Sequence, residues 1–164
     1  MAHFAEINSS NVVQRCIVIS NEDVVANGGD YTADVESWVK TKFGGHAWLQ
    51  CSYNKNVRGE FPGKSWHWSP TKSKFYEPRP IDYHELPCDA CTLNADTLQW
   101  DYPVTAPTFD QREYIDEEDG IKKQMVSRWE DSSGKWRGCK DGFYGNCLTE
   151  WYWNPSTSSW DEIT

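Results

Sequence analysis

Cysteine pairs are the first feature of this chain that could do chemistry, because thiolates bind metals, form disulfides and act as nucleophiles. The chain has six cysteines. Cys88 and Cys91 form a Cys-x-x-Cys pair, and Cys139 and Cys147 flank a glycine-rich loop. One interpretation is a disulfide within each pair, formed in an extracellular particle.

Two other states of these thiols stay open. In the first, Cys88 and Cys91 form a zinc knuckle, and His67 or His84 stands in for a second knuckle. The other cysteine pair is spaced too widely to form a standard one. In the second state the thiols are free. A thioredoxin-like redox site is not indicated, because no βαβ pattern follows the Cys-x-x-Cys pair. We favour a chain without a bound metal ion or cofactor.

No catalytic constellation is visible in the sequence. No serine or cysteine nucleophile stands on a glycine-flanked elbow. The glycines of Gly44-Gly45 and of residues 142–145 lack the spacing and the lysine of a phosphate-binding loop. The acidic run at 116–119 lacks the alternation and the closing glutamate of a calcium loop. A pair of carboxylates that meets only in space would not be visible, but we predict that the chain is not an enzyme.

Aromatic residues recur seven positions apart around polar turns, and this repeat organises most of the chain. Directly opposed residues of an antiparallel pair lie on the same face, so the spacing of seven predicts a β-hairpin closed by two packed side chains. Serine, threonine, asparagine and proline supply the turns. The predicted pairs are Trp68/Phe75, Leu93/Trp100, Trp129/Trp136 and Trp153/Trp160, in which Leu93 replaces an aromatic residue.

These rings have two interpretations. The first is structural: opposed rings hold together hairpins that would be marginal as two strands alone. The second is sugar stacking on exposed indoles, for which the candidate platforms are Trp68, Trp100, Trp136, Trp153 and Trp160. We favour the structural interpretation, because the spacing is what cross-strand pairing requires.

The N-terminal third predicts a small sheet with one amphipathic helix. Residues 2–7 and 12–19 alternate or are β-branched, which indicates an opening hairpin. Thr32 is a candidate N-cap, and the helix that follows ends at Gly44-Gly45. Residues 46–53 form another strand. Cys16 and Cys51 stand alone in apolar strands and are expected to be small buried side chains.

Composition completes the prediction of fold class and domains. We expect a mainly β protein of consecutive aromatic hairpins with one short N-terminal helix. Three segments are predicted: a hairpin and helix module with two aromatic hairpins at 1–103, an acidic linker at 104–124, and a hairpin pair at 125–164. The net charge of −9 argues against binding a phosphate backbone. The first residues lack a signal-peptide pattern, and no apolar run approaches a membrane span.

The sequence resembles a family of small virion proteins of tailed phages, especially those of marine cyanophage type. The resemblance covers the first hundred residues and the last dozen or so, and the acidic stretch and third hairpin look like an insertion. Cys88-x-x-Cys91 is a second departure, since it stands where a short turn is usual. The motifs are Met1 to Ile7, Asn8 with Asn11-Val12-Val13, Phe43-Gly44-Gly45, Ser52-Tyr53-Asn54, Asn56-Val57-Arg58, Pro62-Gly63, Tyr76 with Pro78 and Pro80, Leu93-Asn94 with Trp100, and Trp153-Asn154 with Thr157 and Trp160.

The resemblance implies a non-catalytic virion structural protein that is assembled in the host cytoplasm and stays in the virion. We expect it to decorate or cement the capsid exterior. The alternatives are a tail- or fibre-associated virion protein, or a glycan-binding module that uses the hairpin tryptophans. The expected partners are other virion proteins, either the major capsid protein or tail components, and further copies of the chain. Neither nucleic acid nor a membrane is expected as a partner.

Overall fold

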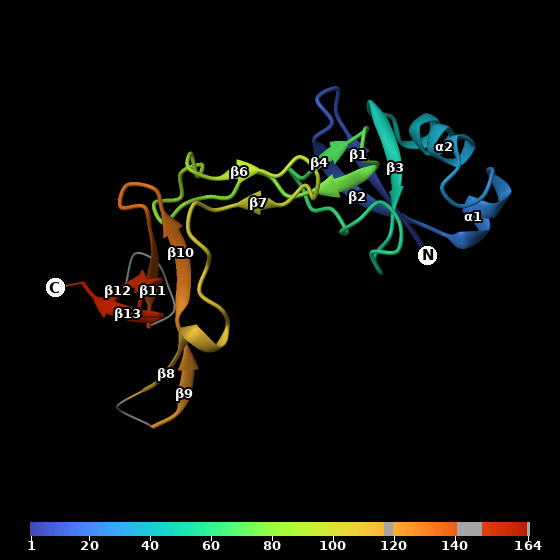
Figure 1. The fold of residues 1–164 in the computed structure, drawn as a ribbon. Coiled ribbons are helices and arrows are strands. Elements are labelled where there is room, and N and C mark those ends of the chain that lie inside the picture. Colours follow the sequence, from blue (N-terminus) through green and yellow to red (C-terminus); the bar gives the residue numbers. More distant parts are fainter. Residues whose placement is uncertain (117–119, 141–148, 164) are drawn as a thin grey trace. The chain divides into compact units, whose positions relative to one another are not determined.

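The computed structural model describes residues 1–116, 120–140 and 149–163 (Figure 1). The chain is mainly β, as the sequence predicts, and its sheets are small and antiparallel. It divides into two compact units, Met1–Pro78 and Arg79–Thr164. No helix in the described ranges is long and apolar enough to cross a membrane.

The first unit is built on a three-stranded sheet with the order β2-β1-β3. Its strands are β1 (Ala2–Ile7), β2 (Val13–Ile19) and β3 (Ala47–Cys51). The opening hairpin is therefore confirmed. Its turn is fixed by Asn8, whose Oδ1 accepts hydrogen bonds from the backbone N–H groups of Ser10 and Val12 at 2.9 and 3.0 Å. Such Asx turns replace missing backbone bonds with a side-chain acceptor.

Two helices accompany this sheet, whereas the sequence predicted one. They are α1 (Asn21–Ala26) and α2 (Ala33–Phe43). The short α1 was missed because Asn21 and Asp23 are of residue types that are common in turns. Ser20 caps this helix by accepting a hydrogen bond from the Asp23 N–H. Thr32 caps α2 as predicted, through the Val35 N–H at 3.3 Å.

Helix α2 ends at Gly44 with a φ of 73°, a conformation that favours glycine. Its apolar stripe covers one face of the sheet, where Val35 and Val39 pack with Phe4 and Trp48. Phe43, the last residue of α2, is exposed, and its ring centroid lies 6.2 Å from that of Trp48. The opposite face of the sheet is covered by the first aromatic hairpin.

This first hairpin consists of β4 (His67–Ser69) and β5 (Lys74–Tyr76). Trp68 and Phe75 are directly opposed and their ring centroids lie 4.8 Å apart, so the predicted pair is confirmed. Phe75 is buried against Ile7 and Val13. The pair therefore joins the hairpin to the sheet as well as closing it.

The second unit contains a four-stranded sheet with the order β10-β11-β12-β13 and two smaller hairpins. The large sheet comprises β10 (Val126–Glu130), β11 (Lys135–Cys139), β12 (Glu150–Asn154) and β13 (Ser159–Glu162). The smaller hairpins comprise β6 (Thr92–Leu93) with β7 (Trp100–Asp101), and β8 (Glu113–Ile115) with β9 (Lys122–Gln124). A short 3₁₀ helix, Asp110–Arg112, precedes β8.

These units replace the predicted division at 103/104 and 124/125. The boundary lies between Pro78 and Arg79, because Trp100 of the β6–β7 hairpin packs into the core of the second unit. The stretch predicted to be an acidic linker also carries structure, namely the 3₁₀ helix and the β8–β9 hairpin. The acidic composition alone did not indicate that the backbone of this stretch forms hydrogen bonds with the large sheet.

Candidate functional site

Four tryptophans form one row across the large sheet. Trp129 lies opposite Trp136 on β10 and β11, and Trp153 lies opposite Trp160 on β12 and β13, so both predicted pairs are confirmed. Arg137 is paired with Tyr152, and this register places Trp136 beside Trp153. Because alternate residues of a strand share a face, all four indoles project from the same side of the sheet.

This tryptophan face is the core of the second unit. Trp129, Trp136 and Trp153 are only 2%, 7% and 5% exposed and pack with the Cys-x-x-Cys segment. Indole N–H groups of the row also bind backbone carbonyls outside the sheet. The indole of Trp136 donates to the Val104 carbonyl at 2.9 Å, and that of Trp160 donates to the Gln111 carbonyl at 2.7 Å. The row therefore holds residues 104–111 against the sheet.

The degenerate pair Leu93/Trp100 is also directly opposed, as predicted. Trp100 is half-buried, and the Arg79 guanidinium lies 5.5 Å from its ring. In the first unit, the Arg58 guanidinium lies 5.5 Å from the ring of Trp68. Each of the two rings thus contacts a cation of its own unit, which is a structural use of the aromatic face.

A groove of ≈ 320 Å³ opens at the turn end of the large sheet, where Trp136, Tyr152 and Trp153 contribute to its wall. Sugar stacking needs an exposed ring face. Two of these rings are buried, and the Lys135 ammonium lies 4.8 Å from the centroid of the third, Tyr152. With two rings buried and the third beside a cation, the groove does not favour sugar stacking on the hairpin tryptophans.

Cys88 and Cys91 form a disulfide, with their Cα atoms 5.4 Å apart. Asp131 holds this segment to the sheet. Its carboxylate accepts hydrogen bonds from the indole N–H of Trp129 at 2.5 Å and from the backbone N–H groups of Asp89 and Ala90. This half-buried acceptor, bonded to three donors, fixes the segment against the tryptophan face.

The remaining thiols and histidines do not assemble a metal site. Cys139 is also disulfide-bonded, and its predicted partner Cys147 lies outside the described residues. His67 stacks on Tyr76 with ring centroids 5.3 Å apart. Within residues 1–116, 120–140 and 149–163, no group of three or more His, Cys, Asp or Glu side chains could hold a metal ion.

Cys16 and Cys51 are free thiols that contact each other. The interaction between the two thiols lowers the pKa of Cys16, whose Sγ donates to the Pro62 carbonyl at 3.4 Å. The same interaction, together with burial, raises the pKa of Cys51. A thiol with a raised pKa is a poor nucleophile, so Cys51 behaves as the buried apolar side chain that the sequence predicts.

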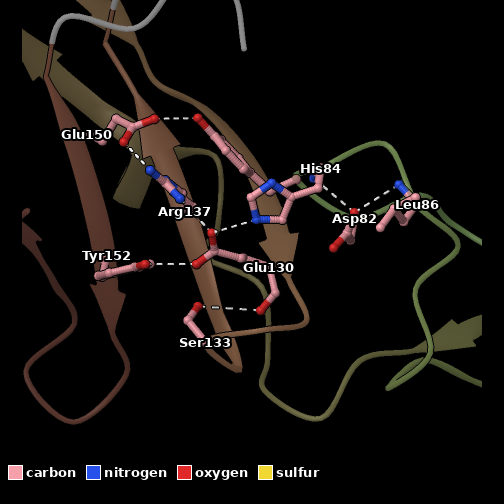
Figure 2. A network of polar contacts seen from close by, with 9 residues as sticks. Asp82, His84, Leu86, Glu130, Ser133, Arg137, Glu150 and Tyr152 are labelled. Carbon is pink, nitrogen blue, oxygen red and sulfur yellow. Dashed lines mark hydrogen bonds and ion pairs between the residues drawn. The ribbon is translucent and has the colours of Figure 1, made fainter. Parts of the chain in front are cut away.

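The face opposite the tryptophans carries a polar network that the sequence analysis missed (Figure 2). We call it the Glu130 network, and it consists of Tyr83, His84, Glu130, Arg137, Glu150 and Tyr152. Arg137 stands at its centre. Its guanidinium donates to Glu130 Oε1 at 2.5 Å and to the carboxylate of Glu150.

Tyrosine and histidine side chains complete the network around these two carboxylates. Tyr152 donates to Glu130 Oε2 at 2.8 Å, and Tyr83 donates to Glu150. The Nε2 of His84 lies 3.2 Å from Glu130 Oε1, and a dashed line marks this contact in Figure 2. The Arg137 guanidinium also lies 4.2 Å from the ring centroid of Tyr83, so this cation has partners on several sides.

The protonation states of the network follow from these contacts. Burial by itself would raise the pKa of both carboxyl groups. For Glu130, hydrogen bonds from Ser133, Tyr152 and Arg137 outweigh burial, and its pKa is lowered. For Glu150, the hydrogen bonds from Tyr83 and Arg137 have the same effect. Burial and the bond to Glu150 raise the pKa of Tyr83 to about 12. Both carboxylates are therefore ionised and both phenols are neutral at pH 7.

The pairing of both carboxylates with Arg137 limits the chemistry that the network could perform. Glycoside hydrolysis needs one carboxyl group that stays protonated and a second that faces the substrate. Here both carboxylates are ionised and share one guanidinium. The Glu130 side chain is 4% exposed, which leaves it no access to a substrate. Arg137 thus offsets part of the negative charge of the two carboxylates, and the Glu130 network joins three strands to the loop that carries Tyr83 and His84.

Comparison with known proteins gives no assignment: no protein-family model, curated protein or solved structure matches the chain.

Proposed function

We propose that this chain is a non-catalytic structural protein of a tailed-phage virion and that it decorates or cements the capsid exterior. The proposal starts from the sequence motifs that resemble small virion proteins. Several of their residues are folding determinants: Asn8 fixes the first turn, Gly44 ends α2, and Trp153 and Trp160 close the last hairpin. A scaffold of this kind suits a protein whose function is to present surfaces.

The observation that carries the proposal is the position of Arg137 between Glu130 and Glu150. These two carboxylates are the best candidates for an acid and a base that meet only in space. Their shared guanidinium keeps both ionised and occupied. The network stiffens the sheet without offering a reactive group, which supports a non-catalytic role.

The charge of the chain and its exposed apolar side chains also support a protein partner. The chain has 25 acidic and 16 basic residues, which disfavours a phosphate backbone as a partner. Exposed apolar side chains occur in both units, for example Val25 and Ile115. Such side chains are contact points when a small accessory protein docks on a larger shell.

The alternative is a virion protein of the tail or its fibres, which would share the same architecture. A binding experiment separates the two. Isolated heads and isolated tails, prepared from a phage from which the gene for this chain has been deleted, are mixed with purified protein and sedimented. We expect the protein to sediment with heads. Sedimentation with tails alone would favour the alternative.

A failure to bind either fraction would overturn the virion role. The control is the double variant Trp129→Ala/Trp136→Ala, which removes half of the tryptophan row. If binding to the particle requires a folded second unit, this variant should not bind. Its N-terminal unit should stay folded, which NMR spectra of the soluble protein would show.

A further inference from the structure

A pocket of ≈ 470 Å³ lies in the N-terminal unit, at the end of the sheet where β1 begins and β3 ends. We call it the N-terminal pocket. Its volume is within the range of sites for small organic ligands. The residues that matter for recognition are His3, Asp30, Tyr31, Gln50, Tyr53 and Asn54. Two of them belong to Ser52-Tyr53-Asn54, a motif that neither the hairpins nor the polar network uses.

Tyr53 is an exposed aromatic platform on the rim of this pocket. Its side chain is 70% exposed, although large rings are usually covered. Neighbouring rings hold it in place: His3 is stacked with a centroid distance of 6.1 Å, and Phe61 meets it edge-on at 5.6 Å. A ring that is held rigidly but left uncovered loses little conformational entropy when a ligand stacks on it.

Gln50 supplies a fixed polar group in the same pocket. It is 2% exposed, and its Oε1 accepts a hydrogen bond from the Tyr31 N–H at 2.6 Å. Its Nε2 donates to Asp30 Oδ1 at 2.5 Å. The Oδ2 of Asp30, an exposed residue, has no hydrogen-bond partner among the described residues. The buried Gln50 thus fixes the position of a carboxylate whose second oxygen can accept a hydrogen bond from a ligand hydroxyl group.

The charges in the pocket select between ligand classes. No lysine or arginine side chain belongs to its wall in the described part of the chain, and the exposed Asp30 carboxylate would repel a phosphate or carboxylate ligand. An alkylammonium ligand would need free aromatic faces. Tyr53 offers such a face beside the Asp30 carboxylate, but the Arg58 guanidinium, which lies 5.8 Å from the ring centroid of Tyr31, adds a positive charge that would repel a second cation. An uncharged ligand rich in hydroxyl groups fits best.

We propose that the N-terminal pocket binds a neutral saccharide unit. Tyr53 stacks on the apolar C–H face of the sugar ring, whose weakly positive hydrogens are attracted to the π face. Asp30, held in place by Gln50, accepts a hydrogen bond from a hydroxyl group of the sugar. This site is separate from the hairpin tryptophans and does not depend on the virion role, although it would allow a surface protein of the virion to contact glycans.

An NMR titration of the full chain tests this site. Uniformly ¹⁵N-labelled protein is titrated with methyl glucoside, methyl galactoside and N-acetylglucosamine at millimolar concentration, and with tetramethylammonium as the charged counter-probe. We expect at least one sugar to shift the backbone signals of residues 2–3, 30–31 and 50–54. Tyr53→Ala should weaken that binding about tenfold, because it removes the stacking platform.

The matched control is Phe109→Ala, which removes a similarly exposed ring from the second unit. It should leave sugar binding unchanged. Because Tyr53 is exposed, its replacement should also leave the other signals of the N-terminal unit in place. The proposal is overturned if no sugar shifts these signals, if Tyr53→Ala binds as well as the native protein, or if tetramethylammonium alone binds. None of these results would alter the sedimentation test of the virion role.

Discussion

The Trp160 indole lies directly over Gly138. A Cβ atom built on Gly138 would come within 2.7 Å of Trp160 Cζ3 and within 3.0 Å of the sulfur of Met125. Gly138 is on β11 and Trp160 is on β13, so the indole reaches across the intervening strand β12. The tryptophan row therefore requires a residue without a side chain beneath it.

Replacing Gly138 by alanine should destabilise the second unit by about 1–3 kcal/mol, because the new methyl group overpacks a filled site. Urea unfolding followed by the indole N–H signal of Trp129 measures this. The double variant Gly138→Ala/Trp160→Leu should recover part of the loss relative to the sum of the single variants. Strict additivity of the two changes would show that the residues do not meet.

Asp131→Ala should lower the free energy of unfolding by about 1–3 kcal/mol, because it leaves the buried N–H of Trp129 without an acceptor. Asp131→Asn keeps one oxygen and should lose less. Thermal melting of the three proteins gives the order native, asparagine variant, alanine variant. Equal melting temperatures for the two variants would mean that the carboxylate position does not hold the Cys-x-x-Cys segment.

Reduction of the Cys88–Cys91 disulfide should destabilise the second unit by about 2 kcal/mol, since the closed loop is very short. Alkylation followed by mass analysis should label neither residue in the unreduced protein and both after reduction. The variant Cys88→Ser/Cys91→Ser should match the reduced protein. Labelling of both thiols without a reductant, or stoichiometric zinc in metal analysis, would contradict the disulfide.

The Glu130 network should make the second unit sensitive to acid. The pKa values of Glu130 and Glu150 are lowered in the folded chain, so these groups stabilise it above the ordinary carboxyl pKa of about 4.3. This contribution is lost as the pH falls through the lowered values. The urea midpoint of the second unit should therefore be steady near neutrality and decrease below about pH 4.5.

Glu130→Gln should flatten that decrease, because one of the two titrating groups is gone. It should also lower stability at pH 7, because Arg137 loses one of its charged partners. The control Glu162→Gln makes the same change in net charge on exposed β13 without touching the network. An unchanged acid decrease in Glu130→Gln would exclude this carboxylate as the source.

The hairpins could be predicted because their signal is local. A spacing of seven with a polar turn specifies the partner of Trp153 or Trp129 without any other part of the chain. The Thr32 cap and Gly44 end of α2 were visible for the same reason. The short α1 was missed, since Asn21 and Asp23 favour turns and caps equally well.

The Glu130 network could not be predicted because it depends on contacts between distant segments. Tyr83 reaches Glu150 from a loop before the first strand of the large sheet. The available signal is the alternation of charged residues with tryptophans in β10, β11 and β12. The charged residues lie on the second face of the sheet, where they need hydrogen-bond or ionic partners. The position of Trp100 in the second core likewise depends on tertiary packing, which is why the predicted boundary was placed too late.

Quantitative mass spectrometry of purified particles tests the proposed capsid role most directly. Peptides of this chain are counted against peptides of the major shell protein, with isotope-labelled standards for both. The proposal predicts a fixed ratio equivalent to hundreds of copies in each particle, as a decoration of the capsid exterior requires. A ratio equivalent to a dozen or so copies, or absence from washed particles, would contradict it.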